Sequence, residues 1–477
     1  MFKKNLKFSL GLMFVYFLLF TMIDKGYRDD YYRIMEGHFA WDTDGRPLAY
    51  LLVYIINFGG ILTDISPRSY VISAILAALC CAVIGSKILK STPAINAISS
   101  SLIFFSPFFL QNMAYKFDVV TMCASILLCC IPYIYNDKNR WISFLISTIC
   151  LIASLSTYQA SAAFFLMLNT LHLISKEFDK ETCKNSILRL ISFSFSLVFY
   201  KFIIAKIYLS NEHAKYYSEI SLPVNHDAVN LLIKNIKDLF EVLGLVYNAG
   251  NYLVFLPAII IALFCLLKIL LKKSTSKLGV VVFLVTSLAA ISACFLFFIV
   301  KHPSYEVRAM IGFGSFAFVI ASIPVILIKK NNWVTYIAFI PPVIFYTSIT
   351  NDYIVAAKSQ FKYEKQIIEL TYHDYRKLGG EGQMQIFGSF PFSKQARIAF
   401  SKSPILKKFM NSDIQWWSGK YFAYTEYPPS ENIDIITDWR FSRADKLTCD
   451  MKAINYNGIY TTFRENKNIV FVFSKKC

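Results

Sequence analysis

The sequence predicts a polytopic α-helical membrane protein, and two observations carry this prediction. Hydrophobic residues make up 56% of the 477 residues and charged residues only 17%, and the mean hydropathy is +0.46. Soluble globular chains of this length do not normally have that balance. The apolar residues also gather into segments long enough to cross about 30 Å of hydrocarbon, which takes about 20 helical residues. We therefore expect a membrane region built of helices.

About eleven transmembrane helices are expected, because eleven segments of the chain have this length. Three neighbouring segments, between 117 and 175, are short or closely linked and could contain a re-entrant pair, which would lower the number to nine. The segments lie near residues 8–23, 69–89, 95–113, 117–135, 141–157, 159–175, 186–209, 251–271, 278–300, 308–328 and 333–350.

Basic residues give the segments an orientation. Lysine and arginine recur at every second loop, and the positive-inside rule assigns those loops to the cytoplasm. The N-terminus is then cytoplasmic and the C-terminus lies outside. Loop charges of this kind, which also attract anionic lipid, explain the net charge of +18 better than nucleic-acid binding does. The basic clusters are Lys3, Lys4 and Lys7; Lys87 and Lys90; Lys138 and Arg140; Lys176, Lys180 and Lys184; Lys272, Lys273 and Lys277; and Lys329 and Lys330.

Three substantial pieces of the chain are predicted on the outer side: a first loop at 24–67, a middle loop at 210–250 and a polar region at 351–477. Within the first loop, residues 48–62 are too short to span and are expected to form a helix lying along the outer membrane face. The polar region contains the strand-like runs QMQIFGSF and NIVFVFS, so we expect a small α/β domain there. The membrane region accordingly covers 1–350.

Two features of the polar region stay open at this stage. Most of the eleven cysteines lie inside apolar runs, where cysteine behaves as a small hydrophobe, but Cys449 and Cys477 could form one disulfide. Trp416 and Trp417 could stack on sugars or anchor the chain at the membrane surface.

The first loop carries an unusual concentration of charge, in the stretch GYRDDYYRIMEGHFAWDTDGRPL at 26–48. If it is helical, Asp29, Arg33 and Glu36 share one face, and Asp30 points elsewhere. One carboxylate could then be a general base for a hydroxyl, while its neighbour holds an arginine, a sugar hydroxyl or a metal. The alternative is a solvated loop with ordinary ion pairs. The guanidiniums that could handle a charged lipid headgroup here belong to Arg28, Arg33 and Arg46.

Other predicted outer turns repeat this theme. Lys116 and Asp118 lie in NMAYKFD, Gln159 lies in STYQAS and Arg308 lies in KHPSYEVR. Arg308 stands at the mouth of a span and could grip a phosphate bidentately. Lys116 could instead be a snorkelling anchor, and Asp118 a helix cap. No metal-ligand spacing is formed by His213, His226 and His302.

Several motifs are absent from the sequence, and this narrows the chemistry. There is no Walker A loop and no GxGxxG opening a helix, which argues against nucleotide chemistry on the inner face. There is no G-x-S-x-G or Cys/His hydrolase arrangement either.

The acidic loop after the first span, the short interfacial helix, the many spans and the outer C-terminal domain together resemble the C-class membrane glycosyltransferases that use polyprenyl-phosphate sugars. More closely, GYRDDYYRIMEGHFAWDTDGRPL, SPFFLQNMAYKFD and STYQAS resemble the GtrII-type, serotype-converting O-antigen glucosyltransferases of bacteria and phages. The resemblance covers residues 1 to about 350. It implies a GT-C-like membrane fold in the bacterial inner membrane.

The resemblance also implies a reaction. Glucose would pass from undecaprenyl-phosphate glucose to a hydroxyl of the O-antigen in the periplasm, with inversion at the sugar carbon. The family's acidic pair corresponds to Asp29 and Asp30, one of them being the base. No cofactor is required, although Mg²⁺ or Mn²⁺ is an option. The positions expected to bind substrate are Arg28, Arg33, Glu36, Arg46, Lys116, Asp118, Gln159 and Arg308.

Two other functions fit the sequence less well. An O-antigen polymerase or ligase would carry its key arginines in large mid-chain outer loops, and the loop at 210–250 has none. A polyprenyl-sugar flippase without chemistry would need charges deep within several spans, whereas the predicted spans are nearly charge-free at their centres.

Overall fold

The computed structural model describes the whole chain except residues 136–138, 220–225, 249, 273–276, 296–300, 303–305, 329–332, 389, 411–418, 427–433, 439–451 and 474–477. Trp416, Trp417, Cys449 and Cys477 are therefore outside the described residues. The chain forms two compact units. The helical unit comprises Met1–Thr21, Phe39–Gly60 and Ile65–Thr350, and the C-terminal unit comprises Met22–His38, Ile61–Asp64 and Asn351–Cys477.

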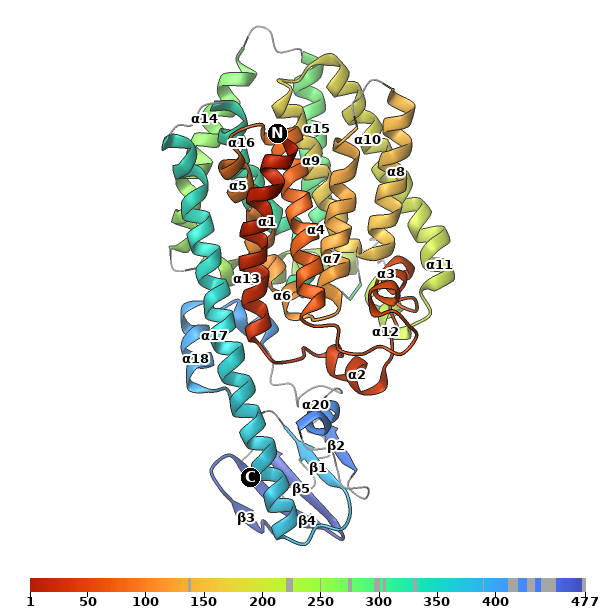
Figure 1. Ribbon diagram of the computed structural model, residues 1–477, viewed down its shortest axis with the longest axis vertical. Coiled ribbons are helices and arrows are strands. Elements are labelled where there is room, and N and C mark those ends of the chain that lie inside the picture. The colour runs from red at the N-terminus through yellow and green to blue at the C-terminus, as the bar shows by residue number, and fades with distance from the viewer. Residues whose placement is uncertain are drawn as a thin grey trace. The chain divides into compact units, whose positions relative to one another are not determined.

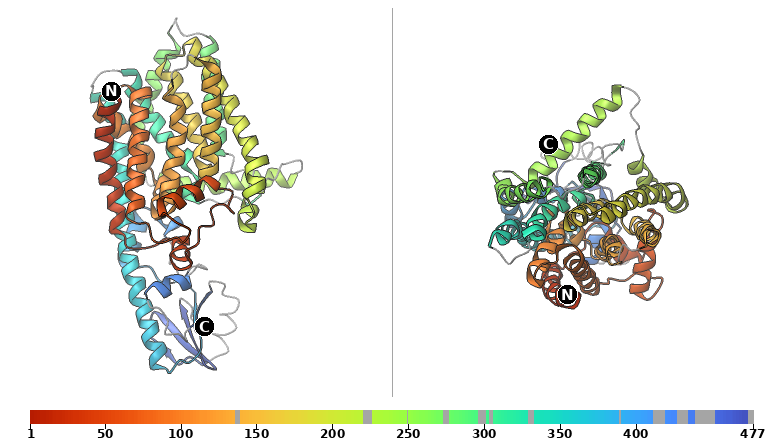
Figure 2. Two further views of the ribbon diagram at one scale, coloured as in Figure 1. Left: turned by 45° about the vertical axis from the view of Figure 1, so that its right-hand side comes forward. Right: turned by 90° about the horizontal axis from the view of Figure 1, so that it is seen from above.

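The helical unit is a bundle of long apolar helices, and each of the eleven predicted segments contains a helix (Figure 1). Helix α1 packs against α4 and α5, α8 against α10, and α9 against α15 and α16. Seen from above in Figure 2, most of these helices run roughly parallel to one another. Their bounds are α1 Phe2–Leu18, α4 Arg68–Ile84, α5 Pro93–Phe105, α6 Pro107–Ala114, α7 Asp118–Cys130, α8 Arg140–Thr157, α9 Ala162–Ser175, α10 Lys180–Phe199, α14 Leu256–Leu270, α15 Lys277–Cys294, α16 Ile311–Ile328 and α17 Trp333–Lys377.

Among the described residues, eight helices are long and apolar enough to cross a membrane, or nine if a bent pair counts as one span. The predicted range was nine to eleven, and the number of spans stays a prediction. The difference arises at α7, which with its 3₁₀ end stops at Tyr133, and at α9, whose 14 residues extend only about 21 Å.

The bent pair is α5 and α6, which meet at an angle of 68°, whereas the re-entrant pair that the sequence allows lies between 117 and 175. Ser106 has extended backbone angles because the following residue, Pro107, disfavours helical geometry before it. The Ser106 hydroxyl then accepts a hydrogen bond from the Phe108 N–H and caps the new helix. The Ser106–Pro107 step therefore marks the break in this segment.

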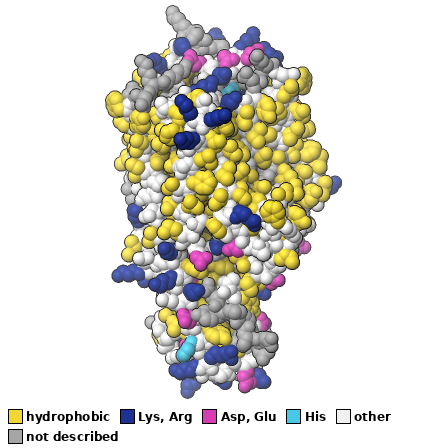
Figure 3. Space-filling model, in the orientation of Figure 1, with side chains coloured by type: hydrophobic (Ala, Val, Ile, Leu, Met, Phe, Trp, Pro, Cys, Tyr) yellow, Lys and Arg dark blue, Asp and Glu magenta, His cyan; other side chains and the backbone are white. Residues whose placement is uncertain are grey.

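The outward faces of the bundle are apolar. Hydrophobic side chains gather over the helical unit in Figure 3, and exposed examples include Phe202, Phe264 and Leu288. Large contiguous apolar surfaces are not stable in water and mark contact with lipid. The chain is therefore a multi-pass membrane protein.

Further helices follow or precede those given above. They are α2 Asp29–Glu36, α3 Pro47–Asn57, α11 Ala205–Tyr208, α12 Glu212–Ser218 and α13 His226–Val246. Helix α3 occupies most of the predicted interfacial segment at 48–62 and ends where Phe58 adopts a left-handed conformation, φ 58°. With 11 residues it is too short to span, and its position along the membrane face stays a prediction.

The C-terminal unit contains a five-stranded mixed sheet in the order β2-β1-β5-β4-β3. The strand-like runs found in the sequence form β1 and β5, which pair in parallel, and β4 and β5 form an antiparallel hairpin. Ile367 and Tyr375 of α17 pack with Ile386 and Phe471 of the sheet. The strands are β1 Met384–Phe387, β2 Ile435–Asp438, β3 Asn455–Tyr456, β4 Tyr460–Glu465 and β5 Asn468–Phe473.

Candidate functional site

The predicted site residues fall into two groups, one within each unit. The acidic stretch of the first loop, with Asp29 and Asp30, belongs to the C-terminal unit. The remaining polar residues of the first loop, including Arg46, and those of the outer turns belong to the helical unit. The two groups are described separately.

The acidic pair opens α2, so both carboxylates lie in its first turn, where the partial positive charge of the helix favours them. Their surroundings differ. Asp30 is fully buried, and its Oδ2 accepts a hydrogen bond from the Tyr27 N–H at 3.0 Å. Asp29 is half-buried and has no hydrogen bond or ion pair with any described residue. Asp30 thus supports the turn through Oδ2, and Asp29 is the more accessible carboxylate of the pair.

The other charged residues of this stretch also differ in exposure. Arg28 and Arg33 are buried, and the Arg28 guanidinium carbon lies 5.2 Å from the centre of the Tyr27 ring. Glu36, at the last position of α2, is exposed. The predicted helical face of Asp29, Arg33 and Glu36 is present, but its three members do not share one environment.

Contacts within the C-terminal unit hold the acidic turn from both sides. Lys25 forms a buried ion pair with Glu364 of α17, with 2.8 Å between Nζ and Oε2. The Tyr27 hydroxyl donates to the carbonyl of Phe409 at 2.6 Å, and the Tyr31 ring packs edge-on against Phe422. The position of the acidic pair thus depends on residues from the far end of the chain.

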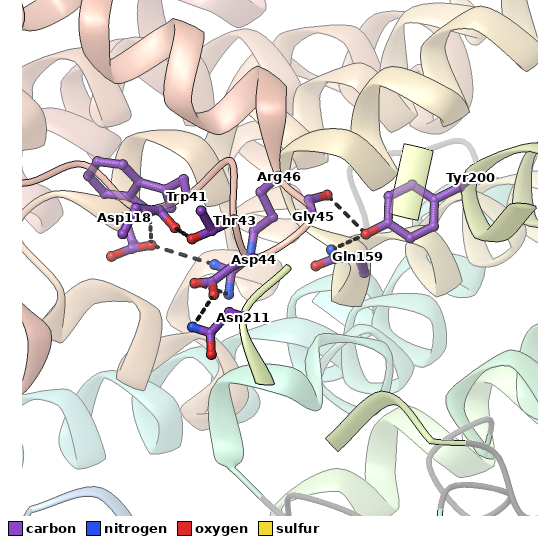
Figure 4. A network of polar contacts seen from close by, with 10 residues as sticks. Trp41, Thr43, Asp44, Gly45, Arg46, Asp118, Gln159, Tyr200 and Asn211 are labelled. Carbon is purple, nitrogen blue, oxygen red and sulfur yellow. Dashed lines mark hydrogen bonds and ion pairs between the residues drawn. The ribbon is translucent and has the colours of Figure 1, made fainter. Parts of the chain in front are cut away.

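In the helical unit, Asp118 is the centre of the second group (Figure 4). It is the first residue of α7 and is 2% exposed. Its Oδ1 accepts a hydrogen bond from the indole Nε1 of Trp41 at 2.7 Å and lies 3.7 Å from Nη1 of Arg46. Its carboxylate thus joins two residues of the first loop to the start of α7.

Some N–H donors of Arg46 have no acceptor among the described residues. Its guanidinium nitrogens lie 3.7 and 4.0 Å from the carboxylate oxygens of Asp118 and Asp44, which is beyond hydrogen-bond distance. Its Nε is buried and has no acceptor among the described residues, while 19% of the side chain is exposed. An arginine offers five N–H donors, so this one can still bind an anion.

Gln159 is linked to the first loop through the hydroxyl of Tyr200, the residue directly after α10 (Figure 4). Its Nε2 donates to the Tyr200 hydroxyl at 2.6 Å, and that hydroxyl donates to the carbonyl of Gly45 at 3.0 Å. Gly45 has φ 75°, and a Cβ there would lie 2.9 Å from the Tyr200 oxygen. Only glycine fits this turn, which carries Asp44 and Arg46 on its two sides.

Arg308 joins the same region through Tyr158. The Tyr158 hydroxyl donates to the backbone carbonyl of Arg308 at 2.9 Å, and the Arg46 guanidinium carbon lies 5.8 Å from the Tyr158 ring centre. Burial raises the pKa of Tyr158 to about 12, although the two arginines act in the opposite direction. The phenol therefore stays protonated at neutral pH and keeps donating.

The Arg308 backbone and side chain are both held in place. Its N–H donates to Oε1 of Gln111 at 2.8 Å, and Gln111 Nε2 donates to Glu306. The guanidinium carbon lies 4.5 Å from the centre of the Tyr115 ring, a cation–π distance. Lys116, between α6 and α7, is buried, which does not fit a snorkelling side chain.

Three residues that contribute to this region were not singled out from the sequence. Trp41 and Gln111 left a signal, since a buried indole N–H and an amide inside an apolar run both require partners. Tyr200 left none, because a tyrosine within a predicted span is unremarkable in the sequence.

No group of three or more potential metal ligands occurs among the described residues. His302 stacks on Tyr216 with ring centres 4.0 Å apart, and the side chains of His213 and His226 are outside the description. If a divalent cation takes part, the donors best suited to it would be carboxylates such as Asp29.

Comparison with known proteins gives a family match. A model of the family described as glucosyl transferase GtrII matches residues 16–320, which is more than half of the chain. A protein of Salmonella phage P22, described as an uncharacterized 55.3 kDa protein in the gtrB 5′ region, is 25% identical over 424 residues. That alignment covers 85% of this chain and 87% of the phage protein. No solved structure matches the chain.

Proposed function

Because the chain belongs to the glucosyl transferase GtrII family and is therefore a glycosyltransferase, we propose that it transfers glucose from undecaprenyl-phosphate glucose to O-antigen. The acceptor is the lipid-linked O-antigen of lipopolysaccharide, and the reaction converts the serotype. It takes place on the periplasmic side of the inner membrane, with the N-terminus in the cytoplasm, as the basic loops predict. The apolar helices suit a donor whose polyprenyl tail stays in lipid.

The observation that carries this proposal is that Arg46 and Arg308 both lie near Tyr158. The Arg46 guanidinium lies over its ring, the backbone carbonyl of Arg308 accepts a hydrogen bond from its hydroxyl, and the positive charges of both side chains oppose the rise in its pKa that burial causes. These arginines come from the first loop and from the turn before α16, and two guanidiniums in one region are suited to a phosphate. Arg46 supplies N–H donors that have no acceptor among the described residues, and its ion pair with Asp118 holds it in place. Charge that develops on the leaving phosphate would be stabilised there.

Asp29 is the proposed general base, because it is the partly accessible member of the pair. It accepts the proton of the acceptor hydroxyl as that oxygen bonds to the anomeric carbon of glucose, and the bond from that carbon to the phosphate oxygen breaks. Undecaprenyl phosphate leaves without needing a proton, so a single base suffices. Displacement from the opposite side inverts the anomeric carbon.

No metal is required in this proposal, since a guanidinium can take the place of Mg²⁺ or Mn²⁺ at the leaving phosphate. The acidic pair remains a possible ligand set for either ion.

The test is transfer by the purified protein. Protein in detergent is incubated with undecaprenyl-phosphate [¹⁴C]glucose and lipid-linked O-antigen, and label in the acceptor is measured. Label in the acceptor supports the proposal. Donor that crosses the bilayer of proteoliposomes without any transfer would instead indicate a flippase. Mass spectrometry of the labelled O-antigen then gives the linkage.

A further inference from the structure

The C-terminal unit contains a basic pocket that the proposed reaction does not use. It has a volume of about 330 Å³ and is lined by residues of α17 and by residues at and just before the start of α18, Lys394–Lys402. Both helices are labelled in Figure 1. Its charged lining consists of Lys362, Lys394 and Arg397, and its walls include the rings of Tyr363 and Phe392. We propose that this pocket binds the phosphate group of a lipid.

The charge of the pocket is uncompensated. No carboxylate lines it, and none of its three cations forms an ion pair with a described residue. Neighbouring cations of the same unit do have acidic partners: Lys402 lies 2.9 Å from Asp352, and Lys25 lies 2.8 Å from Glu364. Three like charges around one cavity repel each other, and a bound anion removes that repulsion.

The first turn of α18 has no acidic residue to balance the partial positive charge at this end of the helix, and a bound anion would balance it. Acidic residues are favourable at such an end, but the first residue of α18 is Lys394. Ser393 caps the helix by accepting a hydrogen bond from the Ala396 N–H and also accepts one from the Ser359 hydroxyl. A negatively charged ligand in the pocket would face the positive end of α18 as well as its cations.

The shape and place of the pocket favour phosphate carried on a lipid. Arginine and lysine together suit a tetrahedral oxyanion, and the two aromatic walls can cover the apolar group attached to it. On α17 the lining begins at Ser359, soon after the apolar stretch of the helix ends. A free phosphate ion has the same headgroup chemistry and is the other possible source.

Binding is tested with the full-length protein in a non-ionic detergent, by calorimetric titration with dihexanoyl phosphatidic acid and, separately, with inorganic phosphate. The pocket variant is Lys362→Gln/Lys394→Gln/Arg397→Gln. The matched control is Lys407→Gln/Lys408→Gln/Lys452→Gln, which removes the same charge from exposed lysines of the same unit outside the pocket. Thermal unfolding of each protein checks the fold, and Lys362→Gln alone replaces the triple variant if that does not fold.

The wild type is expected to bind the lipid, and the pocket variant to bind it at least about tenfold more weakly, since charge-assisted hydrogen bonds are lost. The control should retain its affinity. If the pocket variant weakens binding of the lipid and the wild type does not bind inorganic phosphate, the site is specific for lipid phosphate. If the pocket variant weakens binding of both ligands, the site accepts phosphate from either source. The proposal is overturned if the two triple variants lose the same affinity for the lipid, or if the wild type does not bind the lipid. The assay needs no glucosyl transfer, so its result is independent of the proposed reaction.

Discussion

The indole Nε1 of Trp41 donates a hydrogen bond of 2.7 Å to the carboxylate of Asp118, from a position 77 residues earlier in the chain. Both side chains are buried, so the carboxylate cannot replace this donor with water. Because Asp118 also lies beside Arg46, the bond fixes one end of the arginine-containing turn to the start of α7. The first loop is thereby attached to the helical unit by a specific polar contact.

Trp41→Phe is expected to destabilise the protein by about 1–3 kcal/mol, the usual cost of leaving a buried polar group without its partner. Transfer should fall as well, because Arg46 loses the support of a fixed Asp118. The measurement is the apparent unfolding temperature in detergent together with the transfer rate. The double variant Trp41→Phe/Asp118→Asn should lose less stability, relative to the wild type, than the sum of the losses in the two single variants. Strict additivity would contradict the coupling.

Arg46→Gln is expected to lower kcat/KM for the polyprenyl donor by about 10- to 100-fold, the effect of losing charge-assisted hydrogen bonds to phosphate. Arg46→Lys should restore part of it, since an ammonium keeps the charge without the bidentate geometry. The control is Arg140→Gln, which breaks an exposed ion pair with Glu181. If Arg46→Gln and the control Arg140→Gln lowered kcat/KM equally, the proposed contact of Arg46 with the donor phosphate would be wrong.

Asp29→Asn is expected to reduce kcat by about 10²- to 10⁴-fold while the protein still inserts and unfolds at an unchanged temperature. Asp30→Asn should lose less, because the amide oxygen can still accept the Tyr27 N–H. Steady-state transfer rates of both variants decide between the two carboxylates. Full activity in both would remove the acidic pair from the mechanism, and a reversed order would make Asp30 the base.

The buried pair of Lys25 and Glu364 gives a prediction about stability. Glu364→Gln leaves the lysine buried without its charge partner and should cost about 3–5 kcal/mol. Lys25→Met/Glu364→Met removes both charges and should be closer to the wild type. Thermal unfolding and limited proteolysis of the C-terminal unit measure the difference. A double variant as unstable as the single one would show that the ion pair itself is not what matters.

The last prediction concerns the effect of removing divalent cations. If Arg46 stabilises the leaving phosphate, transfer should persist in EDTA and should not increase when Mg²⁺ or Mn²⁺ is returned. Transfer rates in the three conditions test this. Loss of activity in EDTA with recovery by one cation would give the acidic pair the role of metal ligand.

Part of the candidate site could be recognised from composition and position alone. Asp118, Gln159 and Arg308 stand out because polar residues beside apolar runs are few, and the ends of spans are where such residues meet substrate. Tyr200 could not be recognised in this way, and for Trp41 the sequence indicates only that its indole N–H needs a partner. Their importance depends on the partner that each finds, and those partners, Asp118 and Gln159, come from other helices.

The long helices and their approximate bounds follow from the sequence alone, because the length of an apolar run and the charges beside it are local properties. The break between α5 and α6 does not, since Pro324 lies inside α16 without ending that helix. The division of the first loop between two units depends on the tertiary structure, and so does the presence of Arg46 and the backbone carbonyl of Arg308 at Tyr158. The same holds for the burial of Asp30 beside a half-exposed Asp29. Burial and hydrogen-bond partners depend on residues up to hundreds of positions away, and no local pattern carries that information.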